Sequence, residues 1–108
     1  MMYVDFTVDN KEYKLRLNTR AVIALEKQLG CNPLSVFGDG DTIPTITTMV
    51  SILHAALQQY QHSISMNDAY DIFDKYLEEH TMTDFIPVIL DIYKESGLIA
   101  KEDEERKN

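Results

Sequence analysis

The sequence contains no tryptophan, a single cysteine (Cys31), and only four glycines and three prolines in 108 residues. One cysteine cannot form an intramolecular disulfide, so a covalent cross-link within the chain is excluded. The scarcity of glycine and proline indicates that most of the chain lies in regular elements. We expect Cys31 to be a small buried or half-buried apolar side chain, because a catalytic thiol needs a positioned base and no histidine lies near it in the sequence.

Positive charge and long apolar runs are also scarce. Ten Lys and Arg residues stand against eighteen Asp and Glu residues, which gives a net charge of −8. Proteins that bind nucleic acids or anionic membranes gain affinity from Lys and Arg, so we expect neither partner. No stretch approaches the ~20 apolar residues that cross a bilayer, and the N-terminus lacks the pattern of a signal peptide. These features predict a cytoplasmic protein that attracts basic protein surfaces.

The composition is that of an ordinary globular chain, with 44% apolar and 26% charged residues. A chain of this length fits one domain with one core. We expect that domain to cover residues 1–100. The last residues, 101–108, are almost all charged or polar and are expected to form a flexible tail.

The first part of the domain has the alternating pattern of a β-hairpin over residues 3–17. Asp9, Asn10 and Lys11 separate its two halves, and Asp and Asn tolerate the left-handed backbone of tight hairpin loops. The apolar residues that alternate with polar ones are Val4, Phe6 and Val8, then Tyr13, Leu15 and Leu17. Because an isolated hairpin is only marginally stable in water, it must pack on the rest of the chain.

The remainder predicts four to five helical segments, at 19–29, 34–37, 44–60, 65–79 and 83–96, from apolar residues spaced three and four apart. Asn18 or Thr19 can cap the first helix, Gly30 can end it, and Ser65 with Asp68 resembles a capping box. We expect residues 38–41 to form a connecting loop and not a calcium site. The predicted fold class is therefore α+β and mainly α, with an N-terminal hairpin and a compact helical bundle.

Catalytic and metal-binding patterns are missing. The sequence has no glycine-rich phosphate loop and no His-Glu-x-x-His motif. His54, His62 and His80 are not accompanied by the three or four converging ligands that a zinc site needs. We therefore expect no enzymatic activity, no metal and no cofactor.

The last predicted helix is unusual because its polar face is narrow. Its first apolar stripe is Ile86, Ile89, Leu90 and Tyr93, and a second stripe is Phe85, Val88 and Ile92. A helix that is apolar nearly all round is buried on both sides, either by its own domain or by a second chain. Both alternatives stay open from the sequence, and Ile23 on the first helix is a weaker sign of an exposed apolar surface. The hypothesis that follows is a protein-binding surface that contains Phe85, Val88, Ile92, Leu98 and Ile99.

The order of several short segments resembles one known family across nearly the whole chain. These segments are VDNKEYKLRL (8–17), NTR (18–20), LEKQLG (25–30), NPL (32–34), YDIFDKYL (70–77), DFIPVI (84–89) and SGL (96–98). In this order they resemble the tail assembly chaperones of long, flexible-tailed bacteriophages and prophages of Gram-positive hosts.

The resemblance implies a role in tail morphogenesis. Such chaperones bind the tape measure protein, help to recruit tail-tube subunits, associate with copies of themselves and are absent from the mature virion. It would place this protein in the cytoplasm of the bacterial host. The alternative is another small phage morphogenesis or adaptor protein, such as a head–tail connector.

Overall fold

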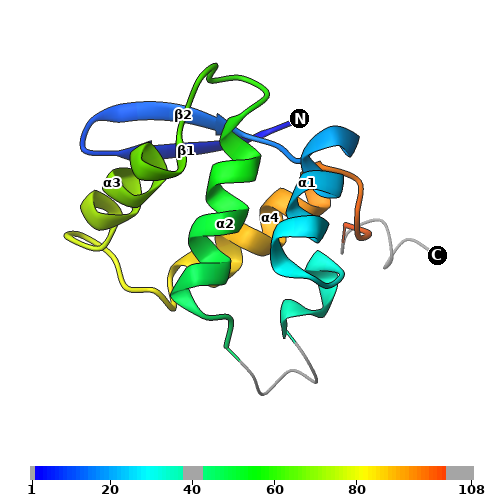
Figure 1. Cartoon of the computed structure of the whole chain (residues 1–108). Coiled ribbons are helices and arrows are strands. Elements are labelled where there is room, and N and C mark those ends of the chain that lie inside the picture. Colours follow the sequence, from blue (N-terminus) through cyan, green and yellow to red (C-terminus); the bar gives the residue numbers. More distant parts are fainter. Residues whose placement is uncertain (1, 38–42, 102–108) are drawn as a thin grey trace.

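A computed structural model describes residues 2–37 and 43–101. The expected loop at 38–41 and nearly all of the expected tail lie outside these residues. The order of elements is β1 (Val4–Val8), β2 (Lys11–Leu15), α1 (Thr19–Leu29), a short 3₁₀ helix η1 (Pro33–Phe37), α2 (Ile46–Leu57), α3 (Met66–Tyr76) and α4 (Phe85–Glu95). The predicted α+β, mainly α architecture is confirmed: the hairpin lies across one end of the helices (Figure 1).

The hairpin forms as its alternation predicts. β1 and β2 pair antiparallel, with Val4 opposite Leu15 and Val8 opposite Lys11. Asp9 and Asn10 form the two-residue loop with φ of 52° and 63°, the left-handed backbone that these residue types tolerate. Phe6, Val8 and Leu15 are buried against the helices, while the alternate residues face solvent.

Local capping signals set the helix ends. The Asn18 side chain accepts from the Ala21 N–H at the start of α1, and Gly30 ends this helix with φ of 73°. Ser65 and Asp68 form the predicted capping box at the start of α3. After α4, Gly97 has φ of 81° and the Leu98 N–H donates to the Tyr93 carbonyl, so Leu98 and Ile99 return over the last turn and pack against the core.

The core is centred on α2. Eight of its twelve residues are buried, which leaves only a narrow exposed side near its N-terminus. α1 and α3 both contact it, the hairpin contacts it through β2, and α4 crosses behind it (Figure 1). Most of the apolar surface of α4 is covered within the chain as well, because Phe85, Ile89, Ile92 and Tyr93 are all buried.

Candidate functional site

A groove between α2 and α3 carries exposed apolar side chains on the surface of the described residues. It encloses about 440 Å³. We call it the α2–α3 groove; its lining residues are Gln28 from α1, Ile46, Thr47, Val50 and Ser51 from α2, and Met66, Tyr70, Phe73, Asp74 and Leu77 from α3.

The groove has a buried floor and exposed walls. Val50 and Phe73 at its floor are 4% and 2% exposed. Ile46 and Tyr70 on its walls are 46% and 52% exposed, although both belong to the apolar stripes of their helices. Two large apolar side chains on the rim of a groove of this size mark a place where a second molecule can remove apolar surface from water.

The position of α3 creates this groove. Gln58 donates to the carbonyls of both His54 and Ile64 at 2.9 Å, which ties the loop after α2 to the last turn of that helix. The Ser65–Asp68 box then starts α3, and the Ser65 N–H that donates to the carboxylate holds the pKa of Asp68 below its ordinary value. Because Ala69, Ile72 and Phe73 face the core, Tyr70 falls at the edge of the buried stripe.

The groove has four polar lining residues. Gln28, Thr47 and Asp74 are exposed, whereas Ser51 is buried at 3% exposure. No ion pair engages Asp74 among residues 2–37 and 43–101. The site therefore combines an apolar trough with one unpaired carboxylate, a combination that suits an amphipathic helix carrying a basic residue beside its apolar face.

Two of the five residues predicted for a binding surface lie in the core. Phe85 and Ile92 have no exposed area. The Phe85 ring packs against the rings of Phe6, Phe73 and Tyr76, with centroids 5.9, 5.2 and 5.6 Å away. The prediction that Phe85 and Ile92 are surface residues is therefore wrong, because both are buried within the chain. Rings from the hairpin and α3 cover Phe85.

The other three predicted residues are half-buried. Val88, Leu98 and Ile99 all pack against the core cluster. Leu98 also borders a shallow hollow of about 360 Å³ beside Val22 and Ile23. Ile23 is 47% exposed, as its position off the main stripe of α1 indicated. The structure thus brings Leu98 and Ile23 together, at a place distinct from the α2–α3 groove.

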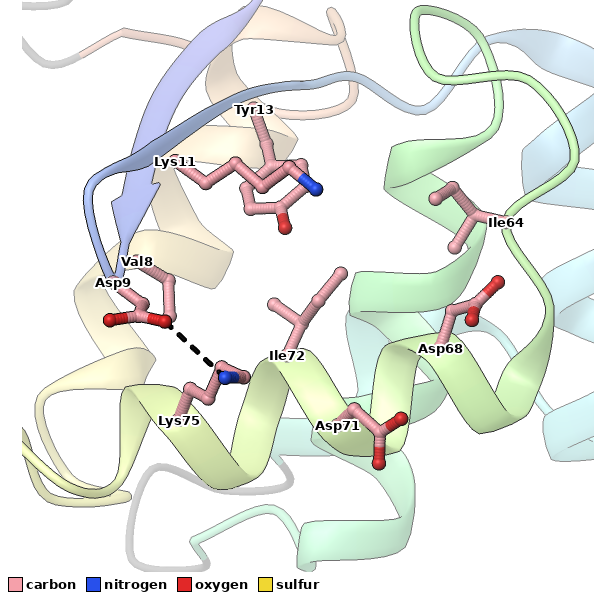
Figure 2. Close-up of a pocket in the computed structure, with 9 residues that line it drawn as sticks. All are labelled: Val8, Asp9, Lys11, Tyr13, Ile64, Asp68, Asp71, Ile72 and Lys75. Carbon is pink, nitrogen blue, oxygen red and sulfur yellow. Dashed lines mark hydrogen bonds and ion pairs between the residues drawn. The ribbon is translucent and has the colours of Figure 1, made fainter.

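A second hollow, of about 390 Å³, separates the hairpin from the outer face of α3 (Figure 2). Tyr13 and Ile72 face each other across it, and Lys75 forms a 3.3 Å ion pair with Asp9 in the hairpin loop. Asp68 also lines this hollow, but its carboxylate already caps α3. The Lys75–Asp9 ion pair joins the hairpin to α3 at this hollow, so we assign it a structural role.

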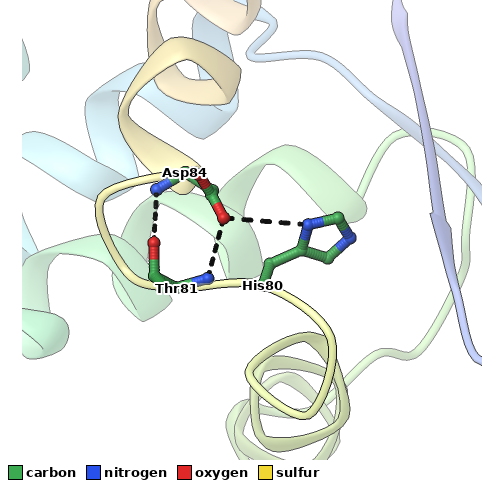
Figure 3. A network of polar contacts seen from close by, with 3 residues as sticks. All are labelled: His80, Thr81 and Asp84. Carbon is green, nitrogen blue, oxygen red and sulfur yellow. Dashed lines mark hydrogen bonds and ion pairs between the residues drawn. The ribbon is translucent and has the colours of Figure 1, made fainter.

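His80 and Asp84 lie close together before α4, and their contact belongs to the turn that leads into this helix. Asp84 accepts from the Thr81 N–H at 2.9 Å, and its own N–H donates to the Thr81 hydroxyl at 3.2 Å (Figure 3). His80 Nδ1 lies 3.9 Å from the same carboxylate, and its ring stacks on Tyr76. The Thr81 N–H lowers the pKa of Asp84, because the hydrogen bond favours the charged form.

Cys31 is exposed, which corrects the expectation that it is buried or half-buried. It follows Gly30 at the end of α1, where the chain turns outward before Pro33 is buried. Within the described residues, no group of three or more His, Cys, Asp or Glu side chains is placed to hold a metal ion.

Sequence reasoning missed the groove because it placed its two exposed wall residues in the core. Ile46 and Tyr70 follow the helical period of their neighbours, so periodicity alone assigns them to buried stripes. A usable signal was the width of the α3 stripe, which includes Met66, Ala69, Tyr70, Phe73, Tyr76 and Leu77. So broad a stripe exceeds what one neighbouring helix covers, and its edge residues are the ones left exposed.

The fold and the groove define a small α+β domain with an exposed apolar trough on a helical face. Residues 4–108 match a family of unknown function, DUF6096, and the chain belongs to this family. No curated protein and no solved structure matches the chain. In the part of the chain that the structure describes, no helix has the length and apolar character needed to span a membrane.

Proposed function

We propose that this protein is a tail assembly chaperone of a long, flexible-tailed phage or prophage, and that it acts by binding proteins and not by catalysis. In this proposal it binds the tape measure protein in the host cytoplasm, helps to recruit tail-tube subunits and leaves before the virion is complete. The chaperone resemblance supplies the role. The exposed α2–α3 groove is the observation that carries the binding step.

The groove fits the chemistry of such a partner. A tape measure chain presents long apolar helical faces before the tube surrounds it. Until then, a bound partner has to shield those faces from water. A helix laid along the groove would cover Ile46 and Tyr70, which are about half exposed, and would rest on Val50 and Phe73. A Lys or Arg beside that apolar face would reach Asp74 at the rim, in keeping with the net charge of −8.

Co-expression tests the proposal directly. The tape measure protein of the same phage or prophage should remain soluble and co-purify with the wild-type chain. The double variant Ile46→Asp and Tyr70→Asp should lose both effects, because two buried unpaired carboxylates would face the apolar helix. The matched control is Ile23→Asp with Tyr60→Asp, since these residues are 47% and 37% exposed outside the groove.

Two results would count against the proposal. One is a tape measure protein that stays insoluble with the wild-type chain. The other is the presence of this chain in purified virions by mass spectrometry, which would favour a head–tail connector because connectors remain in the particle.

A further inference from the structure

The two edges of the hairpin are treated differently by the rest of the chain. On β2, the Lys14 N–H donates to Gln61 Oε1 at 2.7 Å, and the Gln61 amide donates to the Lys14 carbonyl at 2.9 Å. Just after β2, the Arg16 N–H donates to the Ala56 carbonyl at 3.0 Å. The outer edge of β2 is therefore closed at two successive outward positions by the end of α2 and the loop after it.

The outer edge of β1 is open. Lys14 lies opposite Asp5 in the hairpin, and its main-chain N–H and carbonyl point away from β1. In an antiparallel pair, the N–H and carbonyl of Asp5 therefore point away from β2. By the alternation of an antiparallel ladder, Thr7 also points outward. Among the described residues, no hydrogen bond satisfies the main-chain groups of Asp5 or Thr7, and both side chains are exposed.

We propose that β1 pairs antiparallel with β1 of a second copy, so that two hairpins form one continuous four-stranded sheet. Such an edge is a template for strand addition, and a sheet with more than two strands is more stable than an isolated hairpin. Phe6 and Val8 are already covered by helices on the inner face, so pairing requires no rearrangement of the core. This inference does not depend on the proposed function.

The side chains of β1 are compatible with self-pairing in one register. Self-pairing centred on Phe6 places Asp5 opposite Thr7 of the other copy, twice by symmetry, so no like charges meet at these positions. A register centred on Asp5 would place two carboxylates face to face, and one centred on Thr7 would place Asp5 opposite Asp9 twice. Like charges directly opposite each other are unfavourable. Of these three registers, only the one centred on Phe6 pairs the outward main-chain groups of Asp5 and Thr7 without placing two carboxylates opposite each other.

The first experiment measures association of the full chain by sedimentation equilibrium from micromolar to millimolar concentration. The wild-type chain should dimerise, and Thr7→Pro should abolish the dimer because proline removes an outward N–H of β1. The control is Glu12→Pro, which removes the N–H of the residue opposite Thr7 on the far edge of β2. It should dimerise like the wild type, and circular dichroism should show the same fold for all three proteins.

The second experiment tests the register with variants that keep the main chain intact. Thr7→Lys would face Asp5 of the other copy twice and should tighten the dimer, whereas Thr7→Asp should weaken it, each by about 2- to 30-fold. Asp71→Asn, which matches the charge change of Thr7→Lys at an exposed site on α3, should leave the dissociation constant unchanged.

A monomeric wild-type chain over this range would overturn the inference. So would a dimer that Thr7→Pro leaves intact, or Lys and Asp variants at position 7 with equal affinity. Protection of the Asp5 and Thr7 amides from exchange only after addition of another protein would instead assign the edge to a foreign strand.

Discussion

Replacing Phe85 with alanine separates a core residue from a binding residue. The sequence suggested a partner surface here, whereas the structure buries the ring completely against Phe6, Phe73 and Tyr76. The substitution removes a whole aromatic ring from a site with no exposure. The cavity that remains is lined by rings from β1 and α3, which are fixed by their own packing and can close it only in part.

The expected loss is about 3–5 kcal/mol in the free energy of unfolding, the usual range for a fully buried Phe→Ala change. Small domains have about 5–15 kcal/mol in total, so the variant should fold but unfold at a much lower urea concentration. Equilibrium urea unfolding followed by circular dichroism measures the difference. Val88→Ala is the control: because Val88 is half-buried, its loss should be about 1 kcal/mol.

If Phe85→Ala loses less than about 1 kcal/mol, the ring is not enclosed as described. If the variant keeps wild-type stability but no longer binds its partner, Phe85 belongs to the binding surface. The assignment of the binding surface to the α2–α3 groove would then be wrong.

Two further predictions concern polar groups. The lowered pKa values of Asp68 and Asp84 mean that each contributes stability above the ordinary value of 3.8, and this stability is lost as pH falls through the lower folded pKa. Thermal unfolding is therefore measured at neutral and acidic pH for the wild type and for the double variant Asp68→Asn and Asp84→Asn. The Tm of the double variant should fall less with acid than that of the wild type. Equal decreases would contradict a stabilising role of the hydrogen bonds to Asp68 and Asp84. Tyr93→Phe removes the 2.7 Å hydrogen bond from the buried hydroxyl to the Pro33 carbonyl, so urea unfolding should show a loss of about 1–3 kcal/mol, and an unchanged midpoint would contradict that contact.

Features set by neighbouring residues were predictable from the sequence. The Asp9–Asn10 loop, the Asn18 cap and the Ser65–Asp68 box each depend on side chains within a few residues of the main-chain groups they satisfy. The alternation of β1 and β2 likewise gave the buried face of the hairpin. These signals are local, so they persist whatever the tertiary arrangement.

Features set by the relative placement of elements were not predictable in the same way. Periodicity identified the apolar sides of α4 but not which elements pack against them. The structure shows that the hairpin and α3 enclose Phe85. Periodicity also placed Ile46 and Tyr70 in buried stripes, although both are about half exposed on the walls of the groove. Which edge of an apolar stripe is covered depends on neighbours distant in the sequence, and no local pattern records it.

We propose that the α2–α3 groove binds an apolar helix of the tape measure protein. Isothermal titration of the purified chain with tiled helical segments of that protein measures this binding. Tyr70 is 52% exposed, so about 100 Å² of its surface is available to a partner, equivalent to about 2.5 kcal/mol or roughly 60-fold in affinity. We predict that Tyr70→Ala weakens binding by roughly 10- to 60-fold and that the control Tyr60→Ala changes it by less than about threefold. Equal effects of the two substitutions, or no effect of Tyr70→Ala, would contradict the assignment of the groove.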